Sequence, residues 1–317
     1  MPAKVELPQS LPVNDNVAQN LDASALHHRV AMNELTTIRW SVAEDIEAYK
    51  LWNIPAIGVS WRKLLEFGVQ KGVRLLRQSD MSVSNVGWVG GFTGHNGFGH
   101  SEVMLDAKRA VRVAGQLRSP AVTVLTGPQN RHINSHARRL AVSALCELAD
   151  LAASYNVSIA LQPMHQVYQQ NWSFIHSLDD ALELIEKVNH PAVKLAFGTY
   201  HLGGEEGVCS RIRSIVDKIA VVHLSDCYGS PQHENDREVP GEGHLPLREI
   251  VYALESAGYD GWYETEVWSP DLWKMDHHDL IERCLRSQAA LFSNELKTSF
   301  TGLNTLSEFP DEDSSTY

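Results

Sequence analysis

The chain alternates eight times in succession between a short apolar run and a longer stretch with helical periodicity. The short runs are rich in β-branched and apolar residues, as is typical of buried parallel strands. Consecutive strand–helix units with right-handed crossovers build an all-parallel sheet, and eight of them close into a barrel. The sequence therefore predicts the α/β class and a single (β/α)8 TIM barrel. An open, doubly wound sheet is the structural alternative.

The pattern predicts the bounds of each element. The strands are predicted at residues 36–39, 56–60, 82–88, 121–126, 157–162, 193–198, 219–225 and 261–266. The helices are predicted at residues 42–52, 61–78, 101–117, 135–155, 178–188, 206–217, 246–257 and 277–294. Ser41, with Glu44 three residues later, has the spacing of a capping box at the start of the first helix.

One domain accounts for most of the chain. With 317 residues, 43% of them hydrophobic, the chain is long enough to bury the core of one barrel. We expect an N-terminal extension over residues 1–34, the barrel over residues 35–295 and a flexible acidic tail over residues 296–317.

The composition excludes several classes of partner. The net charge is −12 and basic residues form no cluster, so we expect no nucleic-acid partner. No run of 18 apolar residues occurs, and residues 1–34 lack the apolar core of a signal peptide, so we expect no membrane partner. The four cysteines form no C-x-x-C pair, which favours a reduced, cytoplasmic protein. The Gly-rich residues 90–100 lack a P-loop or dinucleotide pattern, so no nucleotide cofactor is predicted.

Four predicted strands in the second half end at positions where barrel enzymes keep their functional groups. These positions are Gln162, Gly198, His223 and Glu266. Histidine and glutamate bind metal ions and transfer protons, whereas glutamine only donates and accepts hydrogen bonds and glycine has no side chain. A histidine in a strand is often only a packed core residue, but its place at the strand end favours a role in a site.

Other polar residues fall close to these strand ends. Glu264 lies on the same side of its strand as Glu266 and is predicted either to be a buried supporting carboxylate or to pair with an Arg or Lys. Asp226 follows His223 closely enough to accept a hydrogen bond from the imidazole. Arg237 is predicted either to bind a hydroxyl, carboxylate or phosphate, or to form a surface ion pair.

Further candidate residues lie at the predicted mouth of the barrel. His201 lies in the loop after residues 193–198, and His165 follows Gln162. Trp268 lies just beyond Glu266, where an aromatic face suits the C–H faces of a sugar. Taken singly, such a tryptophan is more often a core residue.

An ordered set of motifs resembles the sugar phosphate isomerase/epimerase family, whose members are xylose-isomerase-like TIM barrels. The resemblance covers roughly residues 36–292, nearly all of the predicted barrel. Its motifs are Ala-Leu-Gln-Pro-Met-His at 160–165, Gly-Thr-Tyr-His at 198–201, Val-His-Leu-Ser-Asp at 222–226, Pro-Gly-Glu-Gly-His at 240–244 and Gly-Tyr-Asp-Gly-Trp-Tyr-Glu-Thr-Glu-Val at 258–267.

The resemblance implies a metal site that is incomplete in this chain. The family's four metal ligands are a Glu, an Asp, a His and a Glu on successive strands. They fall on Gln162, Gly198, His223 and Glu266, so the first Glu and the Asp are replaced. A divalent metal such as Mn²⁺, Mg²⁺ or Zn²⁺ on Gln162, His223 and Glu266 is therefore expected to be weakly held or absent.

The resemblance also implies roles for the remaining residues. Glu266 and Gln162 take the positions of the catalytic pair, and His201, Arg237, His165 and Trp268 are expected to bind the substrate. The implied activity is isomerisation or epimerisation of a small sugar, sugar phosphate or polyol derivative. Family members often form homo-oligomers.

Two alternatives belong to other functional classes. A non-catalytic sugar-binding protein is the first, because Gln162 cannot transfer a proton. A metal-dependent hydrolase or lyase with replacement ligands, such as His165, His201 or Asp226, is the second.

Overall fold

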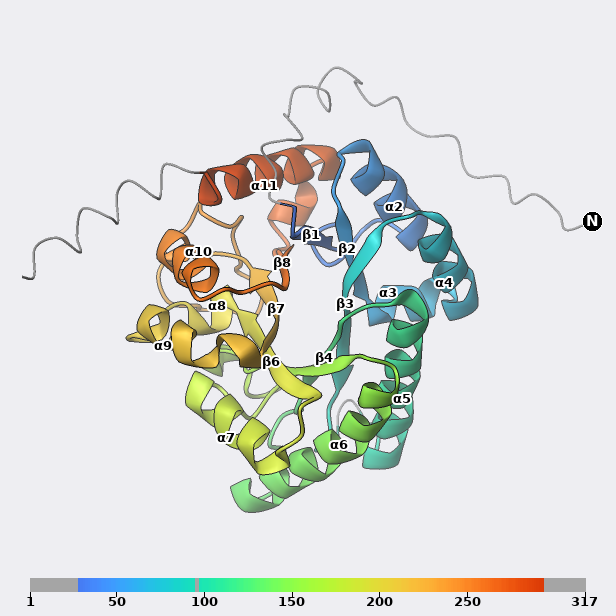
Figure 1. The fold of residues 1–317 in the computed structure, drawn as a ribbon, viewed down its shortest axis with the longest axis vertical. Coiled ribbons are helices and arrows are strands. Elements are labelled where there is room, and N and C mark those ends of the chain that lie inside the picture. The colour runs from blue at the N-terminus through green and yellow to red at the C-terminus, as the bar shows by residue number, and fades with distance from the viewer. Residues whose placement is uncertain (1–27, 95–96, 294–317) are drawn as a thin grey trace, which may run out of the picture.

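The computed structural model describes residues 28–94 and 97–293. Eight parallel strands form a closed barrel in sequence order, and the first strand closes the ring by pairing with the last. Figure 1 looks down the barrel and shows the helices as a ring around the strands. The predicted (β/α)8 TIM barrel is confirmed, and the open doubly wound sheet is wrong.

The elements follow the predicted alternation. The strands are β1 Val30–Asn33, β2 Ala56–Ser60, β3 Ser82–Gly90, β4 Ala121–Leu125, β5 Ser158–Leu161, β6 Val193–Gly198, β7 Ile219–Leu224 and β8 Trp262–Thr265. The helices are α2 Val42–Leu51, α3 Trp61–Phe67, α4 Val69–Gln78, α5 His100–Leu117, α6 Asn134–Ser154, α7 Leu178–Val188, α8 Thr199–Leu202, α9 Val208–Ile215, α10 Leu247–Ser256 and α11 His277–Leu291. Short 3₁₀ turns are η2 Gln166–Tyr168, η3 Val216–Lys218 and η4 Leu272–Lys274. The predicted capping box of Ser41 and Glu44 is present at the start of α2.

The predicted position of the first strand is wrong. The strand lies at Val30–Asn33, and residues 36–39 belong to the loop that follows it. In that loop the Thr36 hydroxyl donates to the carbonyl of Thr265, and the Thr37 hydroxyl donates to Asp45. These bonds to other elements outweigh the strand preference of the Thr-Thr-Ile run. The barrel therefore begins inside the segment predicted as an N-terminal extension.

One predicted helix is divided in the structure, and the two predicted terminal segments are not fully described by it. The helix predicted at residues 61–78 is divided at Gly68 into α3 and α4. The predicted tail, residues 296–317, and most of the predicted extension lie outside the described residues. Among the helices that the structure describes, none is long and apolar enough to cross a membrane.

A layer of small apolar side chains fills the barrel below the strand ends. Ala121, Ala160, Ala196 and Val221 pack together and are fully buried. Side chains two residues apart on a strand share a face, so Gln162, Gly198 and His223 stand on the same interior face, one layer above Ala160, Ala196 and Val221. The alternation of the strands thus places polar side chains at one end of an apolar barrel.

Gly90, at the end of β3, lies where the backbones of β3 and β4 approach each other closely. Its φ is +118°, and a Cβ there would stand 2.1 Å from the carbonyl oxygen of Leu125 in β4. Gly68 also has a positive φ, +96°, but a Cβ there would meet nothing within 4 Å. We predict that Gly68→Ala costs about 1–2 kcal/mol of unfolding free energy, because only the backbone is strained. Gly90→Ala should cost about 1–3 kcal/mol more, because β3 and β4 must also separate. Equal losses in urea unfolding would contradict this account of β3 and β4.

Candidate functional site

Three side chains at the ends of β5, β7 and β8 leave buried polar atoms without partners. Gln162, His223 and Glu266 are at most 1% exposed. Among the described residues, both amide atoms of Gln162, both ring nitrogens of His223 and Oε2 of Glu266 lack a hydrogen-bond partner. Leaving such an atom unpaired costs about 1–3 kcal/mol, so a cluster of them indicates a site for a polar ligand.

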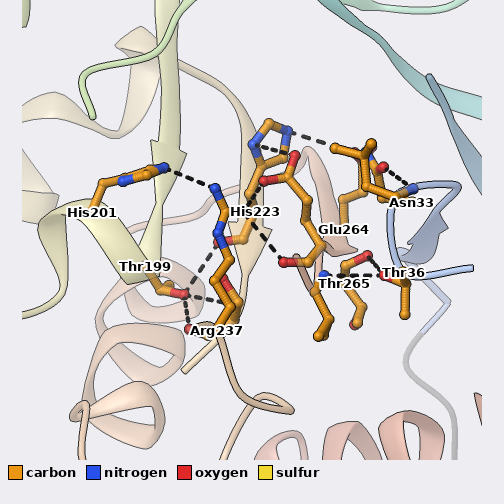
Figure 2. A network of polar contacts seen from close by, with 12 residues as sticks. Asn33, Thr36, Thr199, His201, His223, Arg237, Glu264 and Thr265 are labelled. Carbon is orange, nitrogen blue, oxygen red and sulfur yellow. Dashed lines mark hydrogen bonds and ion pairs between the residues drawn. The ribbon is translucent and has the colours of Figure 1, made fainter. Parts of the chain in front are cut away.

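His223 lies between two glutamates, Glu264 and Glu266, and Figure 2 labels the imidazole and Glu264. Its Nε2 is 3.6 Å from Oε1 of Glu264, and its Nδ1 is 3.5 Å from Oε2 of Glu266. Both oxygens of Glu264 are already bound, one by the amide of Asn33 and the other by the Ser84 hydroxyl at 2.6 Å. Burial raises the pKa of the Glu264 carboxyl above its ordinary value. Glu264 therefore has the geometry of a fixed support beside His223, which is the first of the two alternatives considered from the sequence.

The carboxylate of Glu264 occupies space that an ordinary residue in β2 would need. A Cβ on Gly58 would stand 2.3 Å from Cδ of Glu264 and 2.4 Å from its Oε1. The absence of a side chain at Gly58 is therefore a condition for the position of Glu264.

Arg237 is buried against Glu266 and is not a surface residue. It is 1% exposed, and its Nη1 donates to Oε1 of Glu266. The guanidinium also lies 5.0 Å from the ring centre of Tyr200 and 5.8 Å from those of Trp88 and Trp268. Burial disfavours its charge, but the nearby Tyr168 and Glu266 raise the pKa of Arg237 above its ordinary value. Arg237 thus carries a fixed positive charge beside Gln162, His223 and Glu266, the group of buried residues that we call the polar centre. The surface ion pair considered from the sequence is wrong.

His201 places a second donor beside Arg237 (Figure 2). Its Nδ1 accepts the backbone N–H of His165 at 3.0 Å, which leaves the ring proton on Nε2. That nitrogen is 3.2 Å from Nη2 of Arg237. Burial and then the charge of Arg237 hold the pKa of His201 well below its ordinary value, so the ring is neutral. A ring that is protonated on Nε2 cannot accept from the guanidinium, so these two N–H groups are donors that face each other and share no acceptor among the described residues.

Gly198 leaves a gap that its neighbours occupy. A Cβ at this position would stand 2.9 Å from Cδ2 of His201 and 3.4 Å from Nε2 of Gln162. A carboxylate at position 198 therefore requires both side chains to shift.

Aromatic side chains cover the centre. The ring centres of Trp88, Trp172 and Trp268 lie 5.2–5.7 Å apart. Glu234, in the segment between β7 and α10, accepts hydrogen bonds from Asn171 at 2.7 Å and from Trp172 at 3.1 Å. These bonds join that segment to the loop after β5. We call the three tryptophans the roof.

Two residues near the strand ends have different contacts from those considered for them. The predicted hydrogen bond from His223 to Asp226 is wrong, because Asp226 accepts the backbone N–H groups of Cys227, Gly241 and Leu245 at 2.8–3.0 Å. It shapes the loop after β7. The half-buried imidazole of His165 accepts the backbone N–H of Val167 at 3.4 Å and caps η2.

The structure also brings in residues that the sequence did not single out. Asn33 and Ser84 hold Glu264, and Glu234 joins two loops over the centre. Asn33 ends β1, so the misplaced first strand concealed it. Ser84 lies inside β3 and carries no motif.

His223, Glu264 and Glu266 form one group of possible metal ligands, with ligand atoms within 4.8 Å of one another. The two carboxylates face different nitrogens of the same imidazole. An ion that binds one nitrogen of His223 can therefore bind only the carboxylate on that side of the ring, either Glu264 or Glu266. Glu266 is the better ligand, because its Oε2 has no other partner among the described residues.

A parallel barrel with its buried polar residues at the carboxyl ends of the strands belongs to the (β/α)8 class of proteins. The chain belongs to the xylose isomerase-like TIM barrel family, whose sequence pattern it matches over residues 47–289.

Relatives at modest identity agree with this assignment. An inosose isomerase from Halalkalibacterium halodurans is 23% identical over 196 residues, which cover 60% of this chain and 68% of the relative. A D-psicose 3-epimerase from Ruminiclostridium cellulolyticum is 27% identical over 121 residues, 38% of each chain. The crystal structure of the IOLI protein with a bound zinc atom shares the fold, with a TM-score of 0.72 and 20% identity over 83% of this chain and 97% of that one.

The lowered pKa of His201 predicts a pH dependence of stability. The folded protein binds this proton less readily than the unfolded chain, so the stabilisation is present above about pH 6.5 and is lost as the pH falls below it. We expect His201→Gln to remove up to about 1.4 kcal/mol per pH unit from the slope of unfolding free energy in this acidic range. Urea unfolding from pH 7.5 to 5 measures this, with the exposed His233→Gln as control. Parallel curves for wild type and His201→Gln would contradict the prediction.

Proposed function

We propose that the protein is an isomerase or epimerase of a small sugar, sugar phosphate or polyol derivative. The observation that carries the proposal is the set of polar atoms on Gln162, His223 and Glu266 that are buried at the ends of β5, β7 and β8 and have no hydrogen-bond partner among the described residues. They offer both donors and acceptors, as a hydroxylated carbonyl compound requires. The inosose isomerase and psicose epimerase names of the relatives support the same class.

In this proposal Glu266 is the general base. Its Oε2 removes the proton from the carbon beside the substrate carbonyl, and the electron pair of that C–H bond moves towards the carbonyl oxygen. The N–H groups on Nη2 of Arg237 and Nε2 of His201, which are buried and share no acceptor among the described residues, stabilise the negative charge that develops there. Glu266 then returns the proton to the former carbonyl carbon, while the proton of the neighbouring hydroxyl passes to the charged oxygen of the enediolate, so that the carbonyl moves by one carbon.

Gln162 favours isomerisation over epimerisation. Inversion at carbon by two bases needs a proton donor on each face, and an amide cannot fill that place. Gln162 instead binds a substrate hydroxyl. Glu266 alone moves the proton between neighbouring carbons on one face, which interconverts an aldose-like and a ketose-like form.

We further propose that a divalent metal binds weakly or not at all. The available ligands are Nδ1 of His223, Oε2 of Glu266 and the neutral Oε1 of Gln162, so one anion remains, and Arg237 stands beside it. Hard cations prefer several anionic oxygens, and a guanidinium at van der Waals range opposes a second cation. In this proposal the charge of Arg237, and not a metal ion, stabilises the negative charge that develops on the carbonyl oxygen of the substrate.

Substitution of Glu266 tests the activity. We expect wild type to interconvert at least one member of a panel of inososes, ketohexoses, ketopentoses and their phosphates. Glu266→Gln should lower kcat about 10²–10⁴-fold while substrate still raises the melting temperature. The exposed Glu206→Gln is the matched control. Unchanged turnover in Glu266→Gln would contradict the role of this residue.

The metal content tests the role of Arg237. After incubation with Mn²⁺ or Zn²⁺ and dialysis, elemental analysis should find well under one ion per wild-type chain. The double variant Gln162→Glu, Gly198→Asp should bind more, because it restores two anionic ligands. One tightly held ion per wild-type chain would overturn the proposed charge substitution.

A non-catalytic sugar-binding protein is the second candidate. The neutral Gln162 and the missing side chain at Gly198 favour it. The same panel separates the two, because a binding protein would be stabilised by a sugar without converting it. Replacement-ligand chemistry is not proposed, because His201 Nδ1 and the oxygens of Asp226 are already bound by backbone N–H groups.

A further inference from the structure

The polar centre is closed to solvent. Gln162, His223 and Glu266 are at most 1% exposed. A cavity of about 800 Å³ is lined by the three tryptophans of the roof and by none of these three residues. A ligand can therefore approach the roof without any movement of the chain, whereas it reaches the polar centre only when part of the cover moves.

The cover of the polar centre has an inner and an outer layer. Tyr168 and Tyr200 belong to the inner layer, because their ring centres lie 5.1 and 5.2 Å from that of His201. The segment between β7 and α10 forms the outer layer. The carbonyl of Glu234 accepts the hydroxyl of Tyr168, and the carbonyl of His233 accepts that of Tyr200 at 2.9 Å. The outer layer is therefore attached to the rings that cover His201.

Residues 228–236 of this segment, which we call the flap, are fixed at their two ends. At the base of the flap, Asp226 and Glu238 exchange two backbone hydrogen bonds, of 3.0 and 2.8 Å. Within the described part of the chain, no hydrogen bond between backbone groups joins the flap itself to another element. Most residues of the flap are exposed. A segment with exposed side chains and few backbone bonds opens at a low cost in free energy.

The side chain of Glu234 attaches the flap to the loop after β5. Its two oxygens accept the amide of Asn171 at 2.7 Å and the indole N–H of Trp172 at 3.1 Å. Trp172 is part of the roof, so one carboxylate joins the flap to both the loop and the roof. Hydrogen bonds to a carboxylate are stronger than those between neutral groups, and water can replace them near the surface. This attachment can therefore both hold the flap and release it.

We propose that the flap opens to admit the ligand of the polar centre and that Glu234 is the latch that holds it closed. Opening separates Glu234 from Asn171 and Trp172, and water replaces their hydrogen bonds. The inference rests on the proposed function, because it takes the polar centre to be the place that the substrate must reach. Glu234 contacts neither the substrate nor the reacting atoms in this proposal, so it is a positioning residue.

Chemical modification of two buried histidines tests the inference without a known ligand. Diethyl pyrocarbonate acylates accessible imidazoles, and peptide mass spectrometry measures the rate at each histidine. His223, which is 1% exposed, lies in the polar centre, whereas His277, which is 2% exposed, contacts Arg39 and Trp40. Opening of the flap exposes only His223, and a general loosening of the barrel exposes both histidines.

Glu234→Ala is the variant, and Asn235→Ala, at the exposed position next to it, is the matched control. Modification of His223 should become about tenfold faster or more in Glu234→Ala, because both latch bonds are lost. The rate at His277 should not change, and Asn235→Ala should behave as wild type. An unchanged rate at His223 in Glu234→Ala, or an equal rise at His277, overturns the inference.

The rates of ligand binding give an independent measurement. The probe is the sugar of the panel above that raises the melting temperature of the wild type most, and stopped-flow tryptophan fluorescence follows its binding. In the proposal the latch is closed both before and after binding, so it controls how fast the ligand enters and leaves but not how tightly it binds. Glu234→Ala should raise the association and dissociation rate constants by a similar factor and leave Kd unchanged. A weaker Kd with an unchanged association rate constant overturns the inference.

The outcomes separate this inference from the proposed function. Faster modification of His223 in Glu234→Ala, without conversion of any sugar of the panel, supports the flap and rejects the proposed function. Conversion of a sugar by the wild type, with an unchanged rate of modification at His223 in Glu234→Ala, leaves the proposed function intact and rejects the flap.

Discussion

The buried ion pair between Arg237 and Glu266 organises the mouth of the barrel. Both side chains are at most 1% exposed, so loss of either partner would leave an unpaired charge in the interior, at a cost of about 3–5 kcal/mol. The pair fixes the segment between β7 and α10 to the end of β8. Trp88, Tyr200 and Trp268 pack around the guanidinium, so the cover of the centre depends on the same charge.

Periodicity predicted most of the barrel because seven strands are bounded by clear turns and followed by amphipathic helices. It failed at β1, where a short Val-Ala-Met-Asn run precedes a loop richer in β-branched residues. The strand-end rule placed His223 and Glu266 close together, at 3.5 Å. The strand-end rule did not predict the role of Asn33 or the hydrogen bonds of Asp226. The three-dimensional structure decides which donor lies beside a carboxylate, and the sequence pattern does not show it. The roles predicted for the site residues remain predictions.

The neutral residues at positions 162 and 198 have an electrostatic consequence in the structure. A carboxylate at position 162 or 198 would add negative charge to a compartment closed from water, where only a strongly bound cation balances it. With Gln162 and Gly198 in those positions, the single charge of Arg237 is matched by that of Glu266. The neutral His201 adds a donor and no further charge. A covalently attached cation is always present, unlike an ion that exchanges with solution.

The contact between Gly58 and Glu264 has an evolutionary consequence. A side chain at position 58 would stand within 2.6 Å of all three terminal atoms of this carboxylate, although the two residues lie on opposite ends of the sequence. Position 58 is therefore not free to gain a side chain while Glu264 is kept. Descendants of this chain that keep Glu264 should also keep Gly58, and a larger residue at 58 should mark a lineage in which the support of His223 has been rebuilt.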